Sequence, residues 1–203
     1  MENLLGYVFW HRPRSGTPRR AYEKKLVAFQ ESLKAHRPDG FIDALSFRVE
    51  GRPWSKRRSK GYEDWYLVND FGSLGVLNEA AVAGSTRSPH DDIAREAAGG
   101  AGGIYKQLRG DIPLREARWA TWIRKPAKMP YGEFLGEISM LAGERRRVLW
   151  RRQMVLGPAQ EFCMHSESPL DLGPFKAAKL RVEVVAKASG SPGRRPAPRS
   201  DDL

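Results

Sequence analysis

The sequence has a single cysteine and no long hydrophobic run, and each absence excludes a class of protein. Cys163 is the only cysteine in 203 residues, so no internal disulfide and no zinc site built on several thiolates can form. No stretch reaches the roughly eighteen apolar residues of a membrane span. The first residues also lack the basic region, apolar segment and small-residue cleavage site of a secretory signal. We therefore expect a cytoplasmic protein without a membrane partner.

Histidine is scarce as well, and its spacing argues against a metal site. The four histidines form neither His-x-His nor His-Glu-x-x-His, and the neighbours in His90-Asp91-Asp92 would point to different faces of a helix. We expect no bound metal. The glycine run at 99–103 precedes a predicted strand instead of following one, so it does not fit a dinucleotide-binding loop. We interpret it as a flexible turn.

Positive charge is in excess and is concentrated in a few segments. The formal net charge is +11, from 35 Lys and Arg against 24 Asp and Glu. Much of the excess lies at 52–60, 144–152 and 193–200. A positive charge of this size is consistent with nucleic acid or an anionic ligand as a partner. The alternative is that the basic residues lie in solvated loops and bind nothing. Residues 188–203 are rich in Ser, Pro, Gly and Arg, which predicts a disordered basic tail.

The apolar periodicity predicts a β-α-β-β-α-β unit in the first half of the chain. Thr17-Pro18 and Ser88-Pro89 are typical helix starts, and Asp70 is a third candidate N-cap. A basic loop at 52–60 separates the two middle strands. The predicted strands are 4–10, 41–51, 62–70 and 102–110, and the predicted helices follow Pro18, Asp70 and Ser88.

A second, reduced copy of this unit follows. Trp122-Ile-Arg-Lys-Pro126 echoes Trp10-His-Arg-Pro13, and both corners precede a helix that starts near proline. The expected elements are a strand at 116–126, a helix at 129–143, a hairpin at 148–166 hinged at Gly157-Pro158, a shortened second helix and a strand at 179–188. We predict two units, 1–112 and 113–187.

On these elements the chain resembles the dimeric α/β-barrel superfamily, which includes EthD-like proteins and antibiotic-biosynthesis monooxygenases. The matching segments are FWHRP (9–13), TPRRAYEKKL (17–26), EDWYLVND (63–70) and LNEAA (77–81). The resemblance implies an α+β fold in which two ferredoxin-like (split βαβ) units pack sheet to sheet as a single-chain pseudo-dimeric α/β barrel. Members include cofactor-free oxygenases, haem-degrading enzymes, lactone isomerases and polyketide cyclases, so the fold does not decide the chemistry.

The candidate catalytic residues are His11, Arg12 and His90. His11 ends the first strand, where an imidazole could act as a general base. Arg12 or Asn78 would then stabilise an enolate-like oxygen. His90 would lie in the first turn of a helix. The other two histidines are expected to be peripheral, His36 at an exposed helix end and His165 near the second hairpin.

Aromatic side chains are the candidate ligand-binding groups, together with a carboxylate and an amide. An aromatic-lined cleft suits a planar ligand, and the alternative role for each ring is core packing. Asp64, if buried, needs a cationic partner such as Arg12 or Arg48. Trp54, in the basic loop, is the candidate lid. The full set is Trp10, Trp54, Asp64, Trp65, Tyr66 and Asn78.

These residues predict a small-molecule-binding protein with an aromatic or apolar ligand. As an enzyme it would be a cofactor-independent oxygenase, cyclase or isomerase acting on an aromatic or polyketide-like substrate. The resemblance also allows haem, with Asn78, Trp65 and His90 imitating the trio of the haem-degrading branch. The alternatives are a non-catalytic interaction or ligand-binding protein, and a basic nucleic-acid-binding protein. The last is disfavoured because strands 41–51 and 102–110 lack the aromatic pattern of RNA-stacking strands. The sequence is compatible with a monomer or a homodimer.

Overall fold

Eight antiparallel strands form one closed ring in the computed structural model, which describes residues 4–111, 113–143, 146–154 and 157–185. The ring order is β1-β3-β2-β8-β5-β7-β6-β4. The predicted tail at 188–203 lies outside the described residues. In chain order the elements are β1 (Leu5–Pro13), α1 (Arg19–His36), β2 (Phe41–Arg52), β3 (Ser55–Val68), α2 (Phe71–Ala81), α3 (Gly84–Glu96), β4 (Ala97–Gly110), the 3-10 turn η1 (Leu114–Glu116), β5 (Trp119–Ile123), α4 (Tyr131–Ala142), β6 (Arg147–Arg152), β7 (Phe162–Ser166) and β8 (Ala177–Val184).

The two halves of the ring repeat one strand order. In the first half the order is β4-β1-β3-β2, and in the second it is β8-β5-β7-β6. In both units the first strand of the unit therefore lies between its fourth and its third strand. This is the split βαβ arrangement of a ferredoxin-like unit. The halves join edge to edge where β2 pairs with β8 and β4 pairs with β6. The predicted fold, a tandem of ferredoxin-like units closed into a single-chain barrel, is confirmed.

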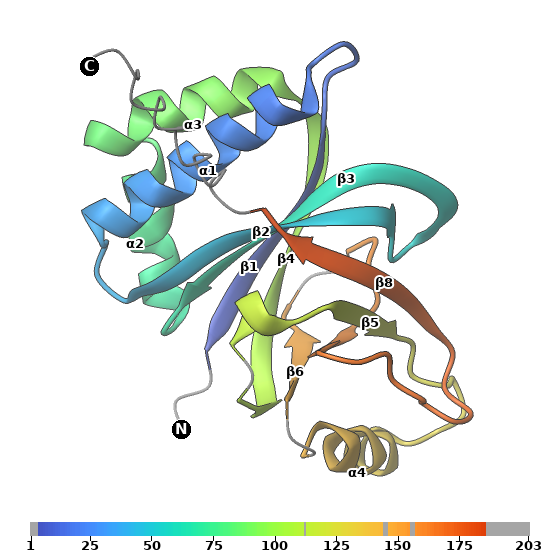
Figure 1. The fold of residues 1–203 in the computed structure, drawn as a ribbon. Coiled ribbons are helices and arrows are strands. Elements are labelled where there is room, and N and C mark those ends of the chain that lie inside the picture. Colours follow the sequence, from blue (N-terminus) through green and yellow to red (C-terminus); the bar gives the residue numbers. More distant parts are fainter. Residues whose placement is uncertain (1–3, 112, 144–145, 155–156, 186–203) are drawn as a thin grey trace, which may run out of the picture.

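Alternate residues of each strand lie on opposite sides of the barrel wall. On β3, Trp65 and Leu67 belong to the buried cluster inside the barrel, whereas Tyr62 and Tyr66 pack outward against the helices. Helices α1, α2 and α3 lie together over the first half, and α4 lies over the second (Figure 1). The structure therefore has three apolar layers: the barrel interior, the space under α1–α3 and the space under α4.

Two segments predicted as loops are strands. The basic stretch at 52–60 continues the β2–β3 hairpin to a tight turn at Pro53-Trp54, because Arg52 pairs with Ser55 and Glu50 with Lys60. The glycine run at 99–103 belongs to β4 and pairs with β1. Glycine fits there because the neighbouring strand lies so close: a Cβ at Gly100 would lie 2.4 Å from the Trp10 carbonyl oxygen.

Several helix boundaries also differ from the prediction. Helix α1 begins at Arg19, and the Thr17 hydroxyl donates to Glu96 instead of capping the helix. Helix α3 begins at Gly84, four residues before the predicted Ser88 cap, with Pro89 inside it. Asp70 does cap α2, by accepting from the Ser73 amide. In the second half, the described residues between β7 and β8 contain no helix, so the shortened second helix predicted there is wrong.

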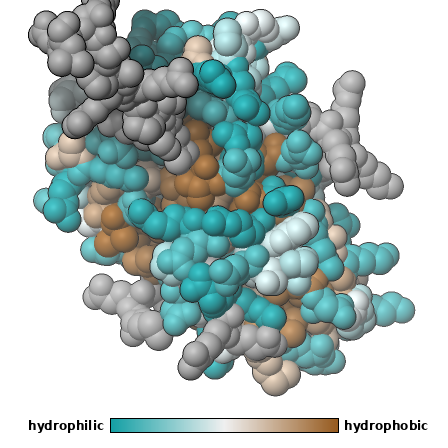
Figure 2. All heavy atoms as spheres, viewed as in Figure 1, coloured by the Kyte–Doolittle hydropathy of each residue, from teal (hydrophilic) through white to brown (hydrophobic). Residues whose placement is uncertain are grey.

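The surface seen in the view of Figure 1 is largely hydrophilic, with hydrophobic residues grouped towards its middle (Figure 2). Over the described part of the chain, no helix combines the length and the apolar character needed to cross a bilayer. The cytoplasmic location stays a prediction.

The close approach at Gly100 can be tested by adding one methyl group. We expect Gly100→Ala to lower the free energy of unfolding by about 1–3 kcal/mol, because the new Cβ meets the β1 backbone and the Phe9 ring. The matched control is Gly136→Ala in α4, where a Cβ would have open space and alanine favours the helix by roughly 0.5–1 kcal/mol. Chemical denaturation measures both variants. Equal changes in the free energy of unfolding for the two variants would contradict the close approach of β4 and β1 at Gly100.

Candidate functional site

A cavity of about 640 Å³ lies between the first half of the sheet and helices α1, α2 and α3. We call it the helix-side cavity. Its lining is mostly apolar and aromatic, with residues from β1, β3 and β4 on the sheet side and from the three helices opposite. Phe71 and Val82, at the two ends of α2, are about half exposed and also line it. This size and character are typical of small-molecule sites.

His11 lies on the sheet wall of this cavity, held between a carboxylate and a phenol. Its Nε2 is 2.9 Å from Asp64 Oδ2, and its Nδ1 is 2.5 Å from the Tyr22 hydroxyl oxygen. The Asp64 contact has the distance of an ion pair without the alignment of a straight hydrogen bond. Phe9 and Tyr62 stack against the ring at 5.3 and 5.5 Å between centroids. All of these contacts restrict the imidazole to one orientation.

Asp64 is buried, and its hydrogen-bond donors are residues other than the predicted arginines. Ser46 donates to its Oδ1, and Gln30 donates in turn to Ser46. The Tyr66 hydroxyl donates to Oδ2 over 3.3 Å. A buried carboxylate needs such partners, because leaving it unpaired is costly.

The two predicted cationic partners of Asp64 lie elsewhere. Arg48 pairs with Glu23 on α1 and Glu183 on β8, so it links the two halves of the barrel. Arg12 is exposed and is not among the residues that line the helix-side cavity. The prediction of an arginine partner failed because alternation within β3 does not show which residue of the neighbouring strand β1 lies beside Asp64. That residue is His11.

The protonation pattern follows from these partners. The negative Asp64 oxygen, 2.9 Å from Nε2, attracts a proton on that nitrogen and would repel a lone pair there, so in neutral His11 the ring proton lies on Nε2 and Nδ1 accepts from the Tyr22 hydroxyl. Burial raises the pKa of Tyr22 far above its usual value, and the charge of Asp64 adds to this. Burial and Asp64 raise the pKa of Tyr66 in the same way. Both phenols therefore stay protonated and act as donors.

Two further predicted site residues line the same cavity. Asn78 comes from α2, and His90 comes from α3, where its ring lies 5.4 Å from that of Phe29. His90 Nδ1 is 3.1 Å from Asp91 Oδ1. Because α3 starts at Gly84, His90 lies in the second turn of the helix and not in the first. The structure thus brings together His11, Asp64, Tyr66, Asn78 and His90.

The predicted tryptophans lie on the other side of the sheet. Trp10 and Trp65 are buried in the barrel interior, and Trp54, at the hairpin tip, packs edge-on against Trp10 at 5.2 Å. None of the three lines the helix-side cavity. Trp54 therefore covers the end of the barrel interior and is not a lid over His11. Asn78, Trp65 and His90 do not fit a shared haem site, because the sheet separates Trp65 from the other two.

No sequence-family model matches the chain, and neither does any curated protein. Solved structures do match it. A candidate monooxygenase from Lactobacillus acidophilus has a TM-score of 0.54 at 9% identity, over 91% of this chain and 95% of that one. An anthrone oxidase-like protein has a TM-score of 0.51 at 10% identity, over 92% and 95%. A candidate chlorite dismutase has a TM-score of 0.51 at 11% identity, over 89% and 94%. The chain has the dimeric α/β-barrel fold. At these identities the likeness concerns the fold alone.

The interior of this α/β barrel holds a second buried carboxylate. Glu63 accepts from the indole nitrogens of Trp10 and Trp65, at 2.9 and 2.7 Å. His165 Nε2 lies 3.8 Å from Glu63, and its Nδ1 lies 3.8 Å from Cys163 Sγ. His165 is fully buried, so its predicted peripheral position is wrong. Burial, reinforced by Glu63, raises the pKa of the Cys163 thiol, so this row of residues does not hold a thiolate nucleophile.

Sequence reasoning missed Tyr22, the residue that completes the His11 cluster. Tyr22 lies on the core-facing side of α1, where it is fully buried. The available signal was its hydroxyl, because a phenol buried on a core-facing helix position needs a hydrogen-bond partner. That partner could have been sought among the polar residues of the adjacent strands.

The role of Asp64 in holding this cluster can be measured through stability. We expect Asp64→Ala to lower the free energy of unfolding by about 3–5 kcal/mol, because His11, Ser46 and Tyr66 lose a buried charged partner. Asp92→Ala, which removes a carboxylate exposed beside Arg95, should leave stability nearly unchanged. Denaturant titrations compare the two. If Asp64→Ala lowers the free energy of unfolding as little as Asp92→Ala does, the cluster around Asp64 contributes little to stability.

Proposed function

We propose that this protein is a cofactor-independent enzyme that removes a proton from an aromatic or polyketide-like substrate in the helix-side cavity. The observation that carries the proposal is the position of His11, on the wall of an aromatic-lined cavity between Asp64 and Tyr22. A base needs an acceptor nitrogen, a fixed orientation and a counter-charge for the cation it becomes. His11 has all three.

In the proposed reaction Tyr22 connects the substrate to His11. The Tyr22 oxygen accepts the substrate proton while the Tyr22 hydroxyl proton passes to His11 Nδ1. The resulting imidazolium lies beside the Asp64 carboxylate, 2.9 Å from Nε2, which stabilises the new positive charge. Tyr22 ends the step as a neutral phenol, in agreement with its raised pKa. The substrate is left as a carbanion or enolate.

The remaining cavity residues favour a planar, largely apolar substrate. Tyr7, Phe9 and Phe29 supply aromatic walls, and α2 adds aliphatic side chains. Asn78 and His90 are polar groups on the helix wall, opposite the sheet that carries His11. From there Asn78 could donate to the oxygen on which charge develops. The carbanion would then react with dioxygen in an oxygenase, or rearrange in a cyclase or isomerase.

Anthrone is a suitable first substrate, and the fold likeness to an anthrone oxidase-like protein supports the choice. Its ring methylene loses a proton to give a delocalised anion. With dioxygen as the oxidant, anthrone then yields anthraquinone and one molecule of water. Exchange of the methylene protons with deuterated solvent under argon isolates proton removal from oxidation. Oxygen consumption in air reports the complete reaction.

We expect His11→Gln and Tyr22→Phe each to slow methylene exchange by about 10²-fold or more, because each breaks the path of the proton. The matched control is Tyr62→Phe, which removes a hydroxyl that donates to Glu23 from a ring stacked on His11. This control should exchange at nearly the wild-type rate.

Binding measured separately decides between an enzyme and a ligand-binding protein. Suppose that anthrone binds to the wild type, but its methylene protons exchange no faster with the protein than without it. The proposed reaction on this substrate is then wrong. If His11→Gln exchanges as fast as the wild type, His11 is not the base.

A further inference from the structure

A second cavity, of about 620 Å³, opens at one end of the barrel, and the proposed function does not use it. We call it the barrel-end cavity. It lies beside η1, and the sheet separates it from the helix-side cavity. Its apolar wall consists of residues of the barrel interior, Leu45, Leu67, Val148 and Trp150, together with Leu114 of η1. It can therefore take an apolar group that enters along the barrel axis.

Trp150 lines this wall, and its buried indole carries an unpaired hydrogen-bond donor. The residue is 1% exposed, and its indole nitrogen has no acceptor among the described residues. An indole N–H can only donate, and buried donors in native proteins are nearly always paired with protein, water or ligand. Because that nitrogen has almost no accessible surface in this structure, Trp150 contributes the apolar part of its indole to the cavity wall.

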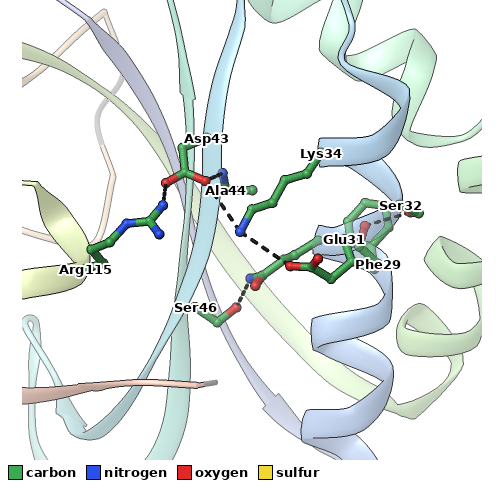
Figure 3. Close-up of polar contacts among 9 residues, drawn as sticks. Phe29, Glu31, Ser32, Lys34, Asp43, Ala44, Ser46 and Arg115 are labelled. Atoms are coloured by element: carbon green, nitrogen blue, oxygen red, sulfur yellow. Dashed lines mark hydrogen bonds and ion pairs between the residues drawn. The ribbon is translucent and has the colours of Figure 1, made fainter. Parts of the chain in front are cut away.

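The rim of the cavity carries three cations against two carboxylates. Lys34, Arg37 and Arg115 are the cations, and Asp43 and Asp111 are the carboxylates. Figure 3 shows Asp43 between Arg115 and Lys34, so this carboxylate is already neutralised. Lys34 also lies 3.6 Å from Glu31.

Arg37 differs from the other two rim cations. Across the described ranges of the chain, no ion pair or side-chain hydrogen bond involves its guanidinium. Its backbone is left-handed, at φ 47°, and ends α1 by donating to the Leu33 carbonyl. Arg37 is therefore an exposed cation at the mouth of an apolar cavity, and it is unpaired within the described part of the chain. It can bind an anionic group at little cost, because no existing pair has to be broken.

We propose that the barrel-end cavity is a second binding site, for a small apolar molecule with one carboxylate- or sulfonate-type anion. The anion lies at Arg37 on the rim, and the apolar body lies against Leu45, Leu67 and Trp150. This site is independent of the chemistry at His11, and its ligand does not enter the helix-side cavity.

Two fluorescent probes with one ring system separate the two parts of the proposal. 8-Anilinonaphthalene-1-sulfonate carries the anion, and N-phenyl-1-naphthylamine lacks it. We expect Arg37→Gln to weaken sulfonate binding about fivefold and to leave the neutral probe unchanged. Asp111→Asn removes a rim carboxylate and should not weaken sulfonate binding. Equal effects of Arg37→Gln on both probes, or no effect on either, would overturn the assigned role of Arg37.

A matched pair of bulky substitutions locates the sulfonate probe. Ile42 lines the barrel-end cavity and is 48% exposed, whereas Val82 lines the helix-side cavity and is 47% exposed. We expect Ile42→Trp to weaken sulfonate binding at least tenfold and Val82→Trp to leave it unchanged. The reverse pattern would place the probe under the helices and overturn the proposal. If Ile42→Trp fails to fold, the Arg37 and Asp111 variants, both at exposed positions, decide the question.

Discussion

Closure of the sheet into a ring is the constraint on which the rest of the structure depends. Each ferredoxin-like half would expose two strand edges, and pairing of β2 with β8 and of β4 with β6 removes all four. Closure also fixes which residues of each strand face inward. On β3 this places Glu63 and Trp65 inside the barrel and Asp64 and Tyr66 under the helices. A slip of one residue would exchange the two sets, so the ring register determines the candidate site.

The same wall thus separates two polar clusters with different surroundings. On the helix side, Asp64 fixes His11 next to a cavity large enough for a small molecule. Inside the barrel, the indoles of Trp10 and Trp65 donate to Glu63, and the surroundings are packed side chains. The two carboxylates are adjacent in sequence, yet only Asp64 lines the helix-side cavity. This difference in access, more than any difference in residue type, is our reason for assigning chemistry to the His11 cluster.

Sequence patterns predicted most of the fold and part of the site. The apolar periodicity of the first half and the Asp70 cap are local signals, and the structure confirms both. The β-structure of 52–60 and of the glycine run was missed because it depends on the partner strand, which no local pattern contains. The cluster at His11 was found only in part for the same reason. Tyr22 reaches it from a helix, and the predicted tryptophans lie across the sheet, so both depend on packing between distant segments.

The state of the His11 ring is the most direct test of this account. Long-range ¹H–¹⁵N correlation spectra report which ring nitrogen carries the proton, and the His11→Gln variant assigns the signals. At a pH where the imidazole is neutral, we predict one tautomer with the proton on Nε2 and an acceptor Nδ1, as the positions of Asp64 and Tyr22 require. A proton on Nδ1, or an averaged signal from two exchanging tautomers, would contradict the arrangement from which the proposed proton transfer is derived.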